Sequence, residues 1–320
     1  MLRTITYGVA VAATATVTAT GLAVTAGGAT ANPVGGAAPT LATTVAYVRS
    51  GDVYTSAGPT ERRITFDGQH RRPRWSPDRK RIAVLRGVQL FVMNADGSAK
   101  RLATSMPAAG AAWSPDGRQL AFASRGCIGG PGVYRVGVTA GGQAATPTPL
   151  FPAECRTRPI PPAPPAAPPA GPLHERLRVD DAVAWSPDGA RIAFRGGDCE
   201  GIFDDCLSLG DLATGAERPL AAFGGGGQAD GFAVVPAFRP DGRALSWTGF
   251  VDGEHPIGVQ THDLTSGATR WHGAPGDREG VYVADHRMLV SGTHRGGTWV
   301  LILNTRTGTR TPLRPGSQPS

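Results

Sequence analysis

One short motif recurs along this chain and constrains its fold more than any other feature. The sequence AWSPDG occurs at residues 112–117 and again at 184–189, with a close copy RWSPDR at 74–79 and a degenerate copy AFRPDG at 237–242. Proline at the second position of a tight turn presets φ, aspartate can bind the backbone that follows it, and glycine accepts positive φ. Each copy therefore predicts a tight turn between two strands of a β-hairpin.

The recurring residues of the motif are interpreted as structural. The aromatic residue is a large apolar anchor between neighbouring sheets, and the aspartate and the glycine make the turn, so no catalytic role is needed to explain them. Arg79 takes the place of glycine in the first copy, and that turn is therefore expected to be strained or of another type. The signature residues are Trp75, Asp78, Trp113, Asp116, Gly117, Trp185, Asp188, Gly189, Phe238, Asp241 and Gly242.

The motif belongs to a longer unit of four strands. A second strand pair with its own turn follows each copy, as in LFVMNADGSAKRLA after Gln89 and VLILNTRTGTRTPL after Trp299. Successive units are separated by 38, 72, 53 and 44 residues, measured between Trp75, Trp113, Trp185, Phe238 and Tyr282. A period of about 40–45 residues with four strands per unit predicts a β-propeller. With one unit before Trp75, we expect an all-β, six-bladed β-propeller of four-stranded antiparallel blades.

The unit RWSPDRKRIAVLRGVQLFVMNADGSAKRLA resembles the repeat of the TolB-type, WD-repeat-like propeller family, and the resemblance covers roughly residues 45–313. It implies the six-bladed fold but is a poor guide to function, because the same repeat occurs in periplasmic TolB, in prolyl-oligopeptidase-type enzymes and in sugar lyases. The separate N-terminal domain of TolB is not expected here, because only about a dozen residues lie between Ala31 and Val45.

The N-terminal segment predicts export. It has one early base and no acid, then an uncharged Ala/Val/Thr stretch and the small residues Ala29-Thr30-Ala31. This pattern is typical of a signal peptide cleaved before Asn32, which leaves a secreted protein without stable membrane insertion; the alternative is an uncleaved anchor. The expected organisation is a signal peptide at 1–31, a linker at 32–42, the propeller at 43–314 with a Pro-rich insert at 156–172 between blades 3 and 4, and a C-terminal tail at 315–320.

The four cysteines of the chain favour disulfides, because their number is even and the chain is expected to be exported. Cys199 ends one strand and Cys206 begins the next, so they face each other across one loop. Cys127 ends a strand of blade 3, and Cys155 follows the last strand of that blade on the same face. We therefore predict the pairs Cys199–Cys206 and Cys127–Cys155.

Candidate binding residues gather on one side of the predicted propeller. The turns between the first and second and between the third and fourth strands share one face, which we call the turn face. The other face, the loop face, receives the loops between the second and third strands and the crossovers between blades. Nearly all irregular sequence falls there, and loops held by a rigid scaffold commonly bind ligands. The irregular segments are residues 125–132, 156–172, 196–206, 223–231, 251–256 and 294–297.

Two charged groups within this plan are candidate sites. The stretch Arg71, Arg72 and Arg74 leads into the innermost strand of blade 2, where an anion or an acidic peptide could bind in the central channel; the alternative is a solvated arginine cluster. The acids before Cys206 form a weak calcium candidate without EF-hand spacing, and a solvated acidic loop is the alternative. Those acids are Asp198, Glu200, Asp204 and Asp205.

The sequence contains no known catalytic motif. G-x-S-x-G, H-E-x-x-H and C-x-x-C are all missing, and the seven histidines are scattered, so no cofactor is expected. The net charge of +7 is weak evidence for an acidic partner, because the basic residues are almost all arginine, which we interpret as codon usage. A nucleic-acid partner is not expected.

Three functions from different classes remain. The first is a secreted, monomeric, non-catalytic propeller that binds an unknown protein or cell-envelope polymer through its loop face. The alternative is an extracellular carbohydrate lyase or hydrolase with its site at the channel mouth, which the small apolar inner segments AAGAAWS and DDAVAWS disfavour. A Tol–Pal component is a third possibility, and the composition argues against it.

Overall fold

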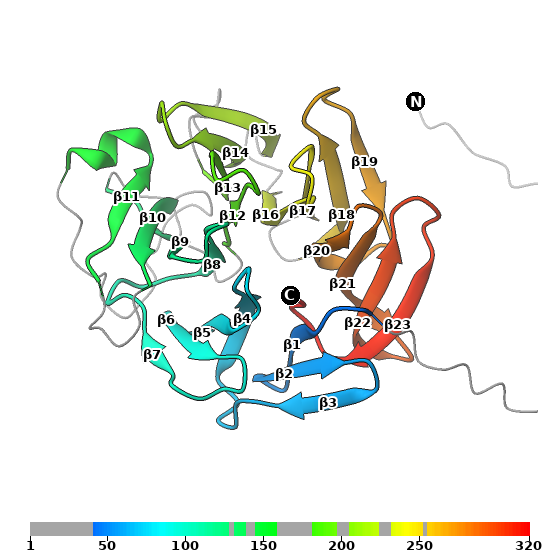
Figure 1. The fold of residues 1–320 in the computed structure, drawn as a ribbon. Coiled ribbons are helices and arrows are strands. Elements are labelled where there is room, and N and C mark those ends of the chain that lie inside the picture. The colour runs from blue at the N-terminus through cyan, green and yellow to red at the C-terminus, as the bar shows by residue number, and fades with distance from the viewer. Residues whose placement is uncertain are drawn as a thin grey trace, which may run out of the picture. The chain divides into compact units, whose positions relative to one another are not determined.

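Six antiparallel sheets arranged in a ring make up the described part of the chain (Figure 1), which confirms the expected all-β, six-bladed propeller. The computed structural model describes residues 41–127, 131–138, 145–158, 181–196, 205–223, 232–251 and 255–320, all within the compact unit Ala38–Ser320. The predicted signal peptide, nearly all of the linker and most of the Pro-rich insert lie outside these residues. No helix among the described residues is long and apolar enough to span a membrane.

The strands follow the chain blade by blade. Blade 1 has β1 (Val45–Arg49), β2 (Asp52–Ala57) and β3 (Thr60–Arg63), and blade 2 has β4 (His70–Trp75), β5 (Arg81–Arg86), β6 (Gln89–Asn94) and β7 (Arg101–Leu102). Blade 3 has β8 (Gly110–Trp113), β9 (Gln119–Arg125), β10 (Pro131–Gly137) and β11 (Thr148–Phe151), and blade 4 has β12 (Ala184–Trp185), β13 (Arg191–Arg195), β14 (Asp205–Asp211) and β15 (Glu217–Phe223). Blade 5 has β16 (Phe232–Phe238), β17 (Ala244–Val251), β18 (His255–Asp263) and β19 (Thr269–His272), and blade 6 has β20 (Arg278–Ala284), β21 (Arg287–His294), β22 (Gly297–Asn304) and β23 (Arg310–Pro315). In blades 2 to 6 the first strand lies innermost (Figure 1).

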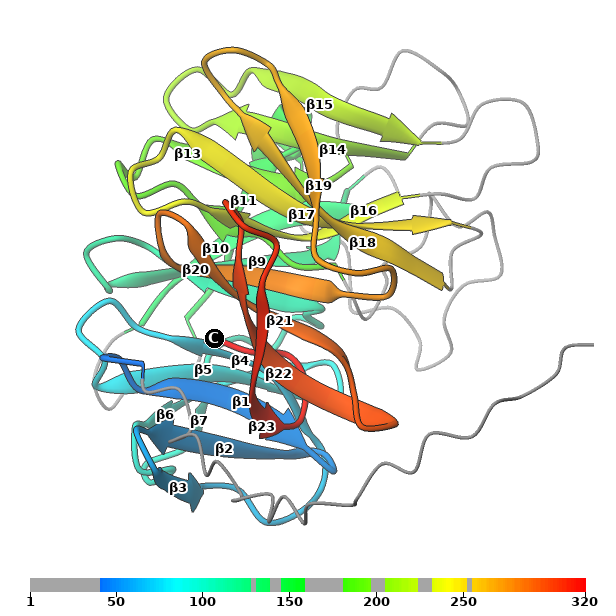
Figure 2. The same cartoon turned by 90° about the vertical axis from the view of Figure 1, so that its right-hand side faces the viewer.

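The C-terminal end of the chain fills the innermost position of blade 1. Ser317 and Val48 exchange two backbone hydrogen bonds of 2.8 Å, and Ser320 and Ala46 exchange two of 2.8 and 2.9 Å. The bridge is antiparallel, and both ribbon views place the C-terminus beside β1 and β4 (Figures 1 and 2). The residues expected as a tail after the propeller therefore supply the fourth strand of blade 1, so both ends of the propeller sequence meet in one sheet.

In blades 2 to 5, the turn after the inner strand has a recurring pattern of hydrogen bonds. In blade 2, Asp78 accepts hydrogen bonds from the Ser76 hydroxyl at 2.6 Å and from the Lys80 amide at 3.1 Å, and these bonds hold the pKa of Asp78 below its ordinary value. Arg79 has φ of 58° and keeps the turn bond to the Ser76 carbonyl at 2.9 Å. This turn is therefore of the same type as the others but strained. The equivalent aspartates, which also accept from the amide two residues on, are Asp116, Asp188 and Asp241, and the equivalent glycines with positive φ are Gly117, Gly189 and Gly242.

Neighbouring blades pack through apolar side chains, and Trp113 shows how the motif contributes. Its ring is only 7% exposed and belongs to the cluster between blades 2 and 3. The ring Nε1 donates to the Arg74 carbonyl at 2.9 Å, and the Arg81 guanidinium lies 4.8 Å from the ring centroid. The aromatic residue thus holds two inner strands together. Trp75, Trp185, Phe238 and Tyr282 at the equivalent positions are partly exposed.

Candidate functional site in the central channel

Three of the inner strands, β4, β16 and β20, contain a β-bulge at the same point of the repeat. Each bulge gives one non-glycine residue a left-handed backbone, with φ of 53° at Arg72, 53° at Val235 and 60° at Glu279. Gln318 in the inner strand of blade 1 has φ of 55°. Such a conformation costs about 1–2 kcal/mol for each L-residue. The surrounding contacts must therefore hold these residues in place, and such strain is common at functional sites.

Three of these strained residues, Arg72, Glu279 and Gln318, form a hydrogen-bonded network across the channel. The Arg72 guanidinium lies 3.0 Å from Glu279 Oε1, and the Arg72 amide donates to Gln318 Oε1 at 2.8 Å. Glu279 Oε2 accepts from the Gln318 amide at 2.9 Å and from the Ser291 hydroxyl, and the Glu279 amide donates to the Thr248 hydroxyl at 2.7 Å. Arg72 and Glu279 are buried. The network therefore connects blades 1, 2, 5 and 6.

A cavity of about 200 Å³ adjoins this network at the loop-face end of the channel. Arg278 is the first residue of β20, and Phe250 is the last but one of β17; both positions lie at the loop-face ends of their strands. Arg278 is half-buried, and its side chain makes no hydrogen bond or ion pair with the described residues. Its guanidinium group is thus available to bind a ligand in this cavity. The lining residues are Arg72, Val234, Val235, Thr248, Phe250, Arg278 and Glu279.

The three arginines singled out in the sequence separate in the structure. Arg72 lines the cavity, whereas Arg74 lies near the C-terminal strand and donates to the Pro319 carbonyl at 3.2 Å. Burial, together with the charge of Arg72, lowers the pKa of Arg74 to about 10, so that it remains protonated at neutral pH. Arg71 donates to the Gly87 carbonyl at 2.7 Å in the turn between β5 and β6. The structure thus brings Arg72, but not Arg71, to the cavity.

Two residues of the cavity, Arg278 and Glu279, were missed by the sequence analysis. A signal for them does exist in the repeat. They lie four and three residues before Tyr282, which are the repeat positions that Arg71 and Arg72 occupy before Trp75 in blade 2. Comparing the residues that precede each turn motif, rather than the motif itself, would have found them.

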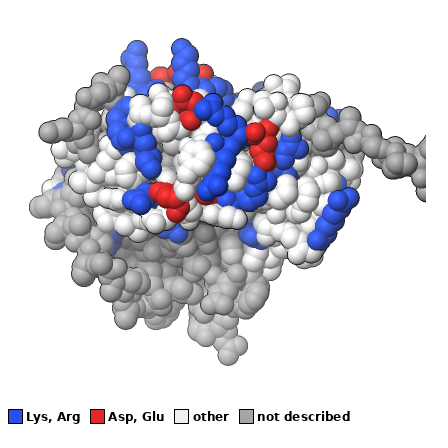
Figure 3. All heavy atoms as spheres, turned by 90° about the horizontal axis from the view of Figure 1, so that it is seen from below, with Lys and Arg blue, Asp and Glu red and all other residues white. Residues whose placement is uncertain are grey.

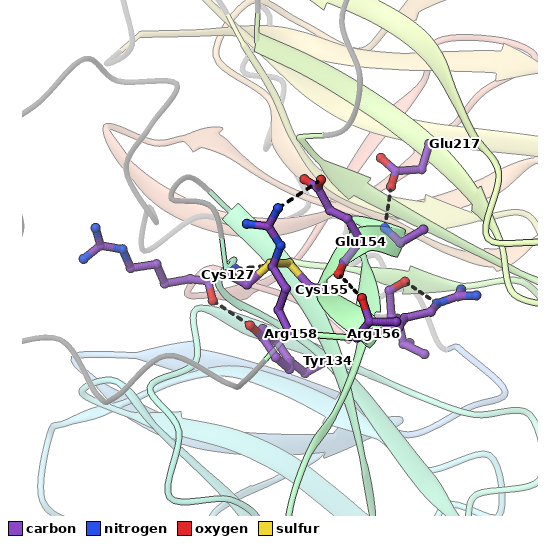
Figure 4. Close-up of a disulfide and its surroundings, with 11 residues drawn as sticks. Cys127, Tyr134, Glu154, Cys155, Arg156, Arg158 and Glu217 are labelled. Carbon is purple, nitrogen blue, oxygen red and sulfur yellow. Dashed lines mark hydrogen bonds and ion pairs between the residues drawn. A yellow bond between two sulfur atoms is a disulfide. The ribbon is translucent and has the colours of Figure 1, made fainter.

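The predicted disulfide between Cys127 and Cys155 is present, with the two Cα atoms 5.5 Å apart (Figure 4). Cys127 follows β9, and Cys155 lies in the short 3-10 helix η1 (Ala153–Arg156) after β11. The amide of Ala153 donates to Glu217 Oε1 of blade 4 at 3.3 Å. The disulfide therefore links the ends of blade 3 on the loop face, where that blade contacts blade 4.

The second predicted disulfide and the calcium candidate lie mostly outside the described residues. Cys206 is disulfide-bonded, but its predicted partner Cys199 is outside that part of the chain. Asp198, Glu200 and Asp204 are outside it as well, and only the backbone of Asp205 is described. In the described ranges, the group of three potential metal ligands is Asp52, Asp67 and His70, none of which lines the channel cavity.

No protein-family model and no curated sequence matches this chain. Among solved structures, the chain is similar to TolB from Acinetobacter baumannii, with a TM-score of 0.63 and 15% identity over 86% of this chain and 65% of that one, which is less than two thirds of its length. A structure from Agrobacterium tumefaciens described as a TolB gives a TM-score of 0.57 and 15% identity over 86% and 90% of the two chains. A nidogen/laminin complex gives 0.55 and 7% identity over 83% and 91%. At such low identities the likeness concerns the fold alone, and in fold the chain is a TolB-like six-bladed β-propeller.

Proposed function

We propose that this protein is an exported, non-catalytic propeller that binds an acidic group of a protein or cell-envelope polymer at the loop-face end of its channel. The observation that carries this proposal is Arg278, a half-buried cation of the cavity that has no partner among the described residues. An anionic group that enters the cavity gains a charge-assisted hydrogen bond there. Arg72, in contrast, is already paired with Glu279.

The size of the cavity supports capture of one group rather than of a whole polymer. Sites for small molecules commonly occupy about 300–1,000 Å³, and this cavity holds about 200 Å³. One carboxylate-bearing side chain fits that volume. The rest of the ligand would lie over the loop face, where the loops contribute contacts and specificity.

A binding role is favoured over catalysis by the way the acidic groups are used. Of the described residues that line the cavity, Glu279 carries the carboxylate. Its two oxygens accept from Arg72, Gln318 and Ser291. Both oxygens of this carboxylate are therefore already engaged by donors of the protein, which leaves it poorly placed to take a proton from a ligand. The motif aspartates are likewise occupied by their own turns.

Export is supported by the disulfide and by the N-terminal sequence pattern. Disulfides form and persist in oxidising compartments such as the periplasm and the extracellular space, and the Cys127–Cys155 bond is of this structural kind. The segment 1–31 carries the features of a signal peptide. Both observations favour a location outside the cytoplasm.

A pull-down from a cell-envelope extract, read by mass spectrometry, tests the proposal. Arg278→Glu is expected to lower ligand capture by about tenfold or more, because it places like charges opposite each other. Arg306→Glu is the matched control, an exposed arginine in the turn between β22 and β23 on the turn face, and should leave capture unchanged. Equal capture by both variants would contradict the site. Turnover of polysaccharide or peptide by the purified protein, abolished by one channel substitution, would contradict the non-catalytic role.

A further inference from the structure

A second and larger cavity lies between blades 1 and 2 and shares no residue with the channel cavity. It holds about 440 Å³ and is formed by the crossover from β3 to β4 and by the turn between β6 and β7. Figure 3 shows the side of the ring that blades 1 and 2 form, where Lys and Arg side chains gather with acidic residues among them. The residues that line the cavity are Ile64, Thr65, Phe66, Asp67, His70, Asp96, Gly97 and Lys100.

Three side chains of this cavity form a fixed polar chain. Asp67 Oδ1 lies 2.7 Å from His70 Nδ1, and Lys100 Nζ lies 3.2 Å from His70 Nε2. His70 is only 2% exposed, and burial together with Lys100 lowers the pKa of its imidazole, which is therefore neutral at pH 7. Because an ammonium group can only donate, Nε2 accepts the hydrogen bond from Lys100, and the proton of the neutral ring is therefore on Nδ1, beside Asp67.

Lys100 therefore has N–H donors that are not used within the protein. An ammonium group carries three N–H donors, and His70 takes one of them. Lys100 is exposed and makes no other hydrogen bond with the described residues. The contact with His70 fixes the position of the ammonium group at the cavity, so that its two remaining donors are available to an acidic ligand.

Phe66 supplies an apolar wall beside this cation. Its ring is 74% exposed, and the Arg63 guanidinium lies 5.1 Å from the ring centroid. The face of an aromatic ring is electron-rich and suits the C–H face of a sugar ring. Asp96 Oδ1 accepts from Ser98 in its own turn, which leaves Oδ2 to accept from a sugar hydroxyl.

The same region does not suit a metal ion, although Asp52, Asp67 and His70 lie close together. Asp52 already accepts from Arg63 at 2.5 Å, from the Thr65 hydroxyl at 3.0 Å and from the Gly68 amide at 3.1 Å. A cation would have to displace these donors. Lys100 and the arginines that bind Asp52 and Asp67 would also repel it.

We propose that this cavity binds an acidic sugar residue, a pyranose that carries a carboxylate. Lys100 donates to the carboxylate, Phe66 contacts the apolar face of the ring, and Asp96 accepts from a hydroxyl group. The site would give the propeller a contact with an anionic glycan that is separate from the ligand of the loop face. It does not depend on the proposed role of Arg278, because the two cavities share no residue.

Titration with D-glucuronic acid and with D-glucose, followed by ligand-observed NMR, tests this site. D-Glucuronic acid should bind at least about tenfold more tightly than its neutral analogue, because only the acid makes the charge-assisted bonds. Lys100→Met should remove that preference, and Phe66→Ala should weaken both sugars. Lys80→Met is the matched control, since Lys80 is the other lysine of the chain and is exposed in the turn between β4 and β5. Lys100 and Phe66 are exposed, so the melting temperature should not change.

Each other outcome of this experiment overturns the proposal. No saturable binding of D-glucuronic acid, equal binding of both sugars, or unchanged binding by Lys100→Met would reject the site. Tighter binding of glucose 6-phosphate than of D-glucuronic acid would show that the cavity recognises a phosphate and not a carboxylate. Loss of D-glucuronic acid binding in Arg278→Glu would show that the sugar binds in the channel cavity instead. Retained binding in that variant is the expected result, even if its capture of the loop-face ligand is lost.

Discussion

The inner strands of blades 3 and 4 differ from those of the other four blades. Three residues before the aromatic signature, blades 3 and 4 have Gly110 and Ala182, neither of which has a left-handed backbone. A Cβ atom at Gly110 would lie 2.6 Å from the Asp181 carbonyl oxygen and 2.7 Å from the Cβ atom of Ala182. These two inner segments therefore pack directly against each other, and we call them the packed half of the channel.

The other blades form a bulged half. Their equivalent positions hold Arg72, Val235 and Glu279, with Gln318 in the inner strand of blade 1, and all four have a left-handed backbone. The bulges of blades 2 and 6 bring the polar residues Arg72 and Glu279 to the cavity, and bulges are common next to functional sites. One repeat thus builds two kinds of channel wall, because its turn motif does not specify the residues before it. Backbone strain gathers where the proposed ligand cavity lies.

The largest expected effect comes from breaking the ion pair of the bulged half. Glu279→Ala removes the carboxylate that faces buried Arg72 and should lower the free energy of unfolding by about 3–5 kcal/mol. The double variant Arg72→Met/Glu279→Leu should recover part of that loss, since apolar replacement of both partners avoids a buried lone charge. Urea unfolding measures both. A loss well under 1 kcal/mol in Glu279→Ala would show that the network does not hold the bulges.

A smaller effect is expected from the packed half. Gly110→Ala places a methyl group against the backbone next to Asp181, and overpacking of this kind costs about 1–3 kcal/mol. Gly137→Ala, at the end of β10 in the same blade, is the matched control because nothing lies within 4 Å of its Cβ position. The two variants are compared by their urea midpoints. Equal midpoints would mean that the inner strands of blades 3 and 4 can separate.

The turn of blade 2 offers a still smaller test of local strain. Arg79→Gly should raise the free energy of unfolding by up to about 1 kcal/mol, because glycine adopts φ of 58° without strain. The lost hydrogen bond from Arg79 to the Thr44 carbonyl offsets part of this gain. The reciprocal change Gly117→Arg, at φ of 68° in blade 3, should be destabilising. A destabilised Arg79→Gly would instead show that the contacts of Arg79 outweigh its strain.

The smallest expected effect is a pH dependence that belongs to one half of the ring. Burial lowers the pKa of His70 in blade 2 and of His262 and His272 in blade 5, whereas the described residues of blades 3 and 4 include no histidine. Below the ordinary histidine pKa of 6.5, the unfolded chain binds more protons than the folded chain. The free energy of unfolding is therefore highest above that pH and falls as the pH drops from 6.5 through the lowered pKa values of the folded histidines. The melting temperature should therefore fall between pH 7.5 and about 5, and less so in His70→Gln. An unchanged melting temperature over this range would contradict the assignment.

The blades and the Cys127–Cys155 pair could be predicted from the sequence because both follow from local patterns. Turn chemistry recurs in each SPDG motif, and the two cysteines fall on one face of one blade. Ring closure could not be predicted, because Ser317 and Ser320 pair with β1 through backbone atoms and carry no side-chain pattern. Arg278 and Glu279 escaped notice for a related reason. They become neighbours of Arg72 only through bulges and through contacts between blades far apart in the chain.

The affinity of the captured envelope ligand for three variants tests the central claim most directly. Arg278→Glu changes the bulged half, Gly110→Ala changes the packed half, and Arg306→Glu changes the turn face, each compared with the unaltered protein in titration calorimetry at fixed salt. The account predicts that Arg278→Glu lowers affinity by about tenfold or more, while the other two bind normally. Normal binding by Arg278→Glu, together with weaker binding by Gly110→Ala, would contradict it and would locate the ligand at the packed half.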